Sequence, residues 1–299
     1  MKTNRTPTLA DVESARRRIA GGIRRTSCLP VPALSEIVGV SLRLKRDDLH
    51  RTGSVRERGA RHALLCLDEA DRTRGVVCAS AGNFALGLAY HGGMLGIRIT
   101  IVLPAGTPEV KVTHCRSLGA TVEVLDGDLA AARARAAQLA AASGAVELDP
   151  SVDPSVAAGQ ATIALEILEQ APAARLVVVP TGGGLPAGVA AVMQELRPGV
   201  RVLAVQPPVS GETETSGLGA VTVSDEEIAA ATNLLACRAG IVAGPAGAAP
   251  LAALLAGHFR AAAGEEVVLA VCAKCYDPRR HTEAVARGAA WLERKAAAG

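Results

Sequence analysis

The residues with the clearest capacity for chemistry lie near the C-terminal end, in the stretch CAKCYD at residues 272–277. Two cysteines flank a lysine there, directly after the apolar run EVVLAV. A lysine amine with a depressed pKa attacks carbonyl carbons, and nearby cations turn a thiol into a nucleophilic thiolate. Lys274, Cys272 and Cys275 are therefore candidate catalytic residues.

Other interpretations of these cysteines stay open. The C-x-x-C spacing also suits a redox pair or half of a zinc site, and both side chains suit burial as small apolar groups. A structural zinc ion takes four ligands, and the sequence has no second C-x-x-C or H-x-x-x-H. His114 beside Cys115 is too isolated to complete such a set, so we predict no metal site.

A second candidate is the segment VVVPTGGGLPAGVAAVM, which predicts a strand, a glycine turn and a helix with Pro186 near its start. Consecutive glycines let backbone N–H groups converge, and the helix N-terminus adds positive potential, so the turn suits a phosphate. It matches neither G-x-G-x-x-G nor a P-loop, which excludes the dinucleotide and nucleoside-triphosphate motifs. A tight strand-to-helix turn without a ligand is the alternative.

The elements that position these residues follow an alternating pattern. Continuous apolar runs separated by alanine-rich amphipathic segments predict a parallel sheet covered by helices on both faces, and hence the α/β class. The predicted helices include residues 128–143, 159–170 and 186–196, and the predicted strand-like runs are 75–80, 98–104, 121–127, 175–184 (which includes the glycine turn), 201–207 and 266–272.

Composition excludes several classes of protein. The chain has 299 residues, enough for one or two domains, and only 2% are aromatic, too few for base-stacking platforms. The net charge of +3 is scattered, so we expect no nucleic-acid partner. Two long uncharged runs, 176–194 and 239–258, are broken by Gly and Pro, which argues against a membrane span. Seven cysteines without framework spacing and no apparent secretion signal lead us to expect a cytoplasmic protein.

Several segments occur together in the order typical of one family. LKRDDLHRTGSVRERGA, ASAGNFALGLA, VVVPTGGGLPAG, VSDEEIAAA and GPAGAAPLAALL resemble the threonine dehydratases and serine racemase-like proteins, from about Leu9 to Asp277. The resemblance implies the two-domain tryptophan synthase β-like fold of fold-type II pyridoxal-phosphate enzymes, with parallel-rich twisted sheets covered by helices. It implies a large domain of residues 1–73 and 149–299, a small domain of residues 74–148, and a homodimer.

The resemblance also assigns residues. The family motif Ser-Phe-Lys-x-Arg-Gly-Ala carries the lysine that forms a Schiff base with the cofactor, and here that position is Arg56. The resemblance places Asn83 at the cofactor ring hydroxyl and the glycine turn at its phosphate. The implied cofactor-binding residues are Asn83, Thr181, Gly182, Gly183 and Gly184, and the implied substrate-binding residues are Ser54, Ser80, Ala81, Gly82 and Phe84.

The chain departs from the family at further positions. Phe84 and Leu86 replace a His and a Gln, and the glycine turn aligns only with a shift of one residue. Gly244 replaces a Glu, and Cys272 replaces the serine that faces the pyridine nitrogen. Between Pro208 and Val221 only VSGETETSGLGA remains, whereas the family has several dozen more residues. We interpret these changes together as a remodelled site.

Our main hypothesis is a divergent threonine dehydratase-like protein that has lost ordinary lysine-dependent chemistry. A guanidinium stays protonated and is a poor nucleophile, but it binds carboxylate or phosphate in a bidentate manner. A surface pair with Glu57 or Asp47 is the simpler role for Arg56. We expect a small amino-acid-like or carboxylate ligand between the two domains, and a role in amino-acid or specialised metabolism.

Two alternatives remain. One is a pyridoxal-phosphate-dependent serine or threonine ammonia-lyase that uses Lys274, and the other is a non-catalytic subunit of a partner enzyme. Pyridoxal phosphate bound non-covalently, or through Lys274, fits the first alternative. Lys45 and Lys111 lie in family-like segments outside the lysine motif and receive no role, and His50 and His62 are interpreted as surface or packing residues.

Overall fold

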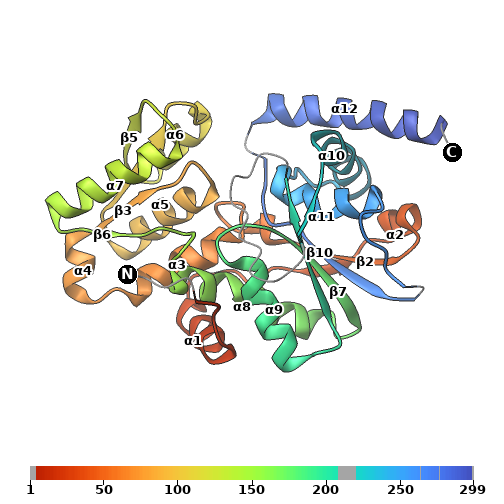
Figure 1. Ribbon diagram of the computed structural model, residues 1–299, viewed down its shortest axis with the longest axis horizontal. Helices are drawn as coiled ribbons and strands as arrows, with labels where there is room; N and C mark the ends of the chain where they lie inside the picture. Colours follow the sequence, from red (N-terminus) through yellow and green to blue (C-terminus); the bar gives the residue numbers. More distant parts are fainter. Residues whose placement is uncertain (1–4, 208–219, 263, 276, 298–299) are drawn as a thin grey trace. The chain divides into compact units, whose positions relative to one another are not determined.

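The computed structural model describes residues 5–207, 220–262, 264–275 and 277–297, and the chain forms two compact units. The first unit combines the residues up to Arg24 with His50–Thr162, and the second combines Arg25–Leu49 with the residues from Ile163 onward. Each unit has its own sheet (Figure 1). The predicted small domain, residues 74–148, lies inside the first unit, and its boundaries stay a prediction.

The first unit contains a parallel sheet of four strands in the order β5-β4-β3-β6. Three of the strands were predicted from their apolar runs, because a strand covered on both faces has no need to alternate polar with apolar residues. The short strand β6 was not predicted. The strands are β3 (Val76–Ala79), β4 (Ile99–Pro104), β5 (Thr121–Leu125) and β6 (Val146–Glu147).

Helices cover this sheet. Ala132, Ala136 and Ala140 recur every four residues on α7 and pack on Val77 and Val102 of the sheet. The spacing predicted this helix, and Asp128 caps it by accepting a hydrogen bond from the Ala131 N–H at 2.9 Å. The helices of this unit are α1 (Leu9–Ile19), α3 (Arg56–Cys66), α4 (Glu69–Arg74), α5 (Asn83–Leu95), α6 (Glu109–Ser117) and α7 (Leu129–Ser143).

The second unit is built on a sheet of six strands in the order β1-β2-β10-β7-β8-β9. Only the pairing of β1 with β2 is antiparallel among the described ladders of this sheet. The central strands β7, β8 and β10 were predicted, and the outer strands were not. The strands are β1 (Cys28–Pro30), β2 (Ser41–Lys45), β7 (Ala174–Pro180), β8 (Arg201–Gln206), β9 (Ala220–Thr222) and β10 (Glu266–Ala270).

Helices lie on both faces of the second sheet (Figure 1). α2 (Pro32–Val38), α10 (Asp225–Ala239) and α11 (Pro245–Leu255) bury one face, where Leu176, Val178 and Leu269 point. α9 (Leu185–Leu196) packs against β7 and β8, and α12 (Pro278–Ala297) packs on α10. In the described ranges no helix combines the length and the apolar character needed to cross a membrane.

Two glycines allow α3 to pack closely against the first turns of α8 (Pro154–Gln170). A Cβ placed on Gly159 would lie 2.7 Å from the Arg58 carbonyl oxygen, and one on Gly59 would lie 2.8 Å from the Val156 carbonyl oxygen. Backbone atoms cannot yield as a flexible side chain would. This crossing therefore sets the position of α3, which begins at Arg56.

We expect the Gly159→Ala variant to lower the free energy of unfolding by about 1–3 kcal/mol, because the added methyl group overpacks the helix crossing. Calorimetry measures this as a lower melting temperature. Gly21→Ala is the matched control, because a Cβ there meets no atom within 4 Å. Equal melting temperatures for the two variants would contradict the prediction.

Candidate functional site

Arg56 is the first residue of α3 and lies at the end of a buried turn. Thr52 and Ser54 are each 1% exposed, and the Arg56 backbone N–H donates to Ser54 Oγ at 3.3 Å. Gly53 has a φ of +59°, a conformation that glycine adopts without strain. The buried backbone of this turn therefore fixes the position from which the Arg56 side chain extends.

The Arg56 side chain is half-buried and points to α8. Its Nη1 donates a hydrogen bond to Oε1 of Gln160, a residue with no exposed surface. The two predicted partners are buried rather than on the surface, and there Glu57 accepts from Thr52 and Asp47 accepts from Thr26. Gln160 was not predicted as a site residue, because it lies 104 positions away in the sequence.

Glu57 stabilises the turn, and His91 lies next to the Glu57 carboxylate. Glu57 Oε2 accepts from the Thr52 backbone N–H at 2.7 Å and from its hydroxyl at 2.8 Å, and His91 Nε2 lies 3.5 Å from Glu57 Oε1. Burial alone would raise the pKa of Glu57, but the nearby His91 ring and the hydrogen bonds from Thr52 outweigh burial and lower it. Burial lowers the pKa of His91, so a neutral ring faces an ionised carboxylate.

We expect Glu57→Gln to lower the free energy of unfolding at pH 7 by about 1.5–3 kcal/mol, since it removes a charged hydrogen-bond acceptor. A depressed carboxyl pKa contributes stability above the ordinary value of about 4.3 and loses it as the pH falls through the folded value. The variant should therefore lose less stability than the wild type between neutral and acid pH. The charged or titratable groups facing this carboxylate are His50, Arg61 and His91.

Urea denaturation at a series of pH values checks both expectations. Glu13→Gln on exposed α1 is the control, because it removes a carboxylate without these buried contacts. Parallel pH profiles for wild type and Glu57→Gln would show that the carboxylate does not support the turn.

A second loop of the same unit joins β3 to α5 and carries the residues Ser80, Ala81, Gly82 and Asn83. Gly82 is exposed, and a Cβ placed on it would meet only Ser80 Oγ, at 3.9 Å. Lys111 Nζ donates to the Ala81 carbonyl oxygen at 3.2 Å, which brings a cation to this loop. The sequence offered no signal for this contact, because Lys111 lies on another helix.

α5 brings this loop close to the Arg56 turn. A Cβ on Gly87, one helical turn after Asn83, would lie 3.5 Å from the Arg56 carbonyl oxygen and 3.3 Å from Glu57 Cα. Phe84 and Leu86 on α5 are 3% and 0% exposed and lie in the core. The first unit thus gathers Ser54, Arg56 and Asn83 on neighbouring elements, while ligand contact by Phe84 stays a prediction.

The glycine turn of the second unit follows β7 and leads into α9. Gly182, Gly183 and Gly184 all have positive φ, of +108°, +57° and +71°, which side chains with a Cβ rarely adopt. The Thr181 N–H donates to the Val205 carbonyl oxygen at 2.9 Å and anchors the start of the turn. This is a glycine-dependent turn at a helix N-terminus, a geometry suited to an anion.

Residues 272–275 leave β10 at the same edge of the sheet, because β10 and β7 are parallel neighbours. Cys272 is 2% exposed, Cys275 is half-buried, and Lys274 is exposed. The Cys275 Sγ donates to the Asp277 carbonyl oxygen at 3.3 Å. The catalytic roles of Lys274, Cys272 and Cys275 stay predictions.

Gly244 is in contact with this segment. Its N–H donates to the Ala273 carbonyl oxygen at 2.9 Å, and a Cβ on it would lie 3.0 Å from the Lys274 carbonyl oxygen. Two positions that depart from the family pattern, Gly244 and residues 272–275, are therefore neighbours in space. A side chain at position 244 would press on the backbone that presents Lys274.

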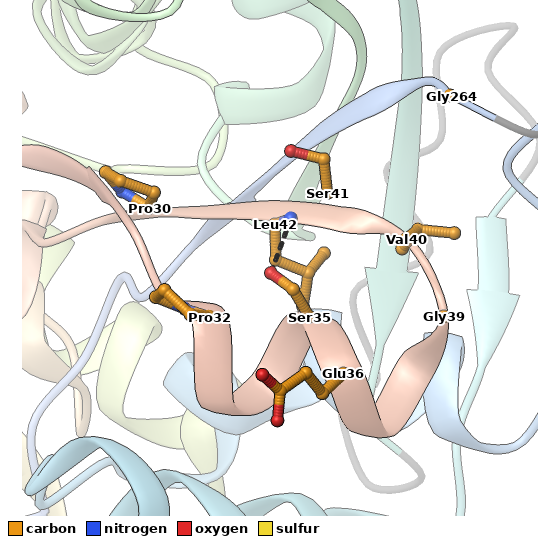
Figure 2. A pocket seen from close by; sticks show the side chains of 9 residues that line it. All are labelled: Pro30, Pro32, Ser35, Glu36, Gly39, Val40, Ser41, Leu42 and Gly264. Carbon is orange, nitrogen blue, oxygen red and sulfur yellow. Dashed lines mark hydrogen bonds between the residues drawn. The ribbon is translucent and has the colours of Figure 1, made fainter.

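An open groove of about 470 Å³ lies away from all these residues, beside α2 and β2 (Figure 2). The Ser35 hydroxyl in it already accepts from the Leu42 N–H at 3.0 Å and donates to the Val31 carbonyl oxygen. Glu36 and Ser41 are the other polar side chains drawn in Figure 2. Among the described side chains no group of three His, Cys, Asp or Glu residues is arranged to hold a metal ion.

Two units with parallel-rich sheets, a glycine turn at a strand end and an asparagine loop at a helix start define an α/β protein of the kind that holds a ligand at the carboxyl ends of its strands. A family model described as pyridoxal-phosphate dependent enzyme matches residues 19–218. The chain belongs to this family, and it has the mixed α/β fold of fold-type II enzymes.

Individual relatives are similar to different extents. The L-threonine ammonia-lyase of Thermotoga maritima is 42% identical over 201 residues, which are 67% of this chain and 50% of the relative. The serine racemase of Dictyostelium discoideum is 30% identical, covering 87% of this chain and 92% of the relative. The structure of threonine deaminase isoform 2 from Solanum lycopersicum has a TM-score of 0.82 at 25% identity, covering 95% of this chain and 91% of that one. The chain thus spans about half the length of the ammonia-lyase.

Proposed function

We propose that this protein is a threonine dehydratase-like family member that binds a small amino-acid-like or carboxylate ligand without a lysine-linked cofactor. The observation that carries the proposal is Arg56 at the start of α3. Its guanidinium is oriented by Gln160, and it stands where the family motif has its lysine. A planar guanidinium recognises a carboxylate through paired hydrogen bonds.

The described residues fit part of the family's cofactor. Pyridoxal phosphate supplies an aldehyde and an electron-withdrawing ring to amino-acid chemistry when it is bound. The glycine turn at residues 181–184 suits its phosphate, because it leads into the N-terminus of α9, where the helix favours an anion. Arg56 does not fit the covalent attachment, because a guanidinium stays protonated.

The positions of Lys45 and Lys295 also argue against covalent attachment of the cofactor. Lys45 is fully buried and donates to Glu166, Gln170 and the Thr26 carbonyl oxygen. Lys295 on α12 lies 4.8 Å from the centre of the Trp291 ring. Neither amine is placed in the turn or the loops that resemble the family site.

Lys111 and Lys274 are the lysines next to candidate site segments. Lys111 donates to the Ala81 carbonyl oxygen, and exposed Lys274 lies at the sheet edge that carries the glycine turn. The position of Lys274 at the sheet edge that carries the glycine turn is the observation that favours the second candidate function, a serine or threonine ammonia-lyase with a displaced lysine.

Thermal unfolding with added ligands tests the proposal. L-Threonine, L-serine and 2-oxobutyrate should each be tried, because a ligand that binds only the folded state raises the melting temperature with concentration. Arg56→Met should abolish the rise, whereas Arg51→Met, which removes an exposed charge in the same segment, should retain it. An equal rise in both variants would overturn the role of Arg56.

Ammonia release separates the alternatives. Wild-type protein supplied with pyridoxal phosphate and L-threonine should release no ammonia. Release that Lys274→Arg abolishes would support the lyase. No ligand response together with stable association with a second enzyme would support the non-catalytic subunit.

A further inference from the structure

Cys66, His62 and Arg18 form a cluster in the first unit, outside the candidate site. The Sγ atom of Cys66 lies 3.5 Å from Nε2 of His62, and Nη1 of Arg18 donates to the same sulfur at 2.9 Å. Cys66 and His62 share one face of α3 because they are four residues apart. Cys66 is exposed, whereas His62 is 5% exposed.

A third group orients the histidine. Nδ1 of His62 lies 2.7 Å from the Ser155 carbonyl oxygen, which can only accept a hydrogen bond, so Nδ1 carries the proton. Nε2 therefore turns its lone pair to the Cys66 sulfur. Asp153 fixes the start of α8 by accepting from the Ser155 N–H at 2.9 Å. A nucleophile, a base and a group that orients the base are the arrangement of an activated thiol.

The protonation states of Cys66 and His62 suit a thiol that gives up its proton only as it reacts. Burial raises the pKa of the Cys66 thiol, and Arg18 opposes that rise, so the resting sulfur keeps its proton. Burial lowers the pKa of His62, which keeps the ring neutral and able to accept a proton. Burial raises the pKa of Cys115 to about 11, and that thiol is 1% exposed with no access for a reagent.

We propose that Cys66 is a nucleophilic modification site that exchanges with small disulfides, with His62 as its base. The Cys66 Sγ attacks one sulfur of the small disulfide while its proton passes to His62 Nε2. A bond forms between Sγ and that sulfur, the original S–S bond breaks, and the departing thiolate takes the proton from His62. Arg18 stabilises the negative charge on Sγ during the attack.

Exchange with dithiodipyridine at neutral pH tests the proposal, with mass mapping of each cysteine over time. Cys237 is an exposed internal reference on α10, in the other unit. Cys66 should react about tenfold faster than Cys237, because a positioned base assists the attack. His62→Gln, whose amide can still donate to the Ser155 carbonyl oxygen, should reduce Cys66 to the Cys237 rate, and Arg18→Gln should slow it several-fold.

Buried cysteines report whether a variant stays folded. Cys78 and Cys115 are 0% and 1% exposed and should remain unmodified in each variant. If His62→Gln exposes these buried cysteines, the surface variant Arg18→Gln tests the proposal instead. Slower Cys66 exchange in Arg18→Gln would support the proposal, and an unchanged rate would overturn it. Cys66 exchange no faster than that of Cys237 in the wild type would also overturn it.

Discussion

Arg56→Lys should give the protein a lysine at position 56 that pyridoxal phosphate can label. After incubation with pyridoxal phosphate and reduction with borohydride, we expect no stoichiometric label on any lysine of the wild type. The variant should carry label at position 56. The physical reason is that a half-buried amine can lose its proton and attack the cofactor aldehyde, whereas a guanidinium stays protonated.

Absorbance spectra and peptide mass mapping measure the outcome. Arg51→Lys is the matched control, because it places a new lysine on the exposed part of the same segment and should show no more than background labelling. Label on Lys274 in the wild type would instead support the ammonia-lyase. Absence of label in Arg56→Lys would mean that the other altered positions had already abolished cofactor binding.

Glu166→Ala should destabilise the second unit by about 3–5 kcal/mol, because it leaves a buried ammonium without its carboxylate. Lys45 Nζ is 0% exposed and contacts Glu166 Oε2 at 2.5 Å, the Thr26 carbonyl oxygen at 2.8 Å and Gln170 Oε1 at 3.0 Å. Trp291, the single tryptophan of the chain, lies in the same unit and reports its unfolding by fluorescence in urea.

Glu169→Ala is the matched control on the same helix. Its carboxylate pairs with Arg25 at the surface, and an exposed pair contributes only about 0–1 kcal/mol. The double variant Lys45→Met with Glu166→Leu should recover most of the lost stability, since an apolar pair can replace a buried ion pair. Equal loss in Glu166→Ala and Glu169→Ala would contradict the prediction.

The elements of both sheets were largely predictable from local pattern. The strands β3, β4, β7, β8 and β10 were predicted because buried parallel strands are continuous apolar runs, β5 because it is rich in β-branched residues, and α7 because its alanines recur on one face. β1, β6 and β9 were missed, because strands of two or three residues carry too little pattern, and β2 was missed because its SLRLK sequence is not a continuous apolar run. The short segment at residues 209–220, where the family has several dozen more residues, lies almost wholly outside the described residues.

The candidate site was only partly predictable. Short motifs identified the turn at Arg56, the loop at Asn83 and the glycine turn, since each depends on residues adjacent in sequence. Gln160 and the contacts of Lys111 and Gly244 could not be found in that way. Each meets its partner through the packing of separate elements, as when Gln160 accepts from Arg56 across 104 positions.

The sequence by itself determined the α/β class, the family resemblance and the arginine in the lysine position, because strand pattern and short motifs are local properties of the chain. Only the tertiary structure decided that Gln160 orients Arg56, that Glu57 and His91 hold its turn, and that Lys45 is committed to a buried ion pair. It also brought His62 and Arg18 to the Cys66 sulfur. Burial and distance, which decide what a side chain can do, arise only when distant segments pack together.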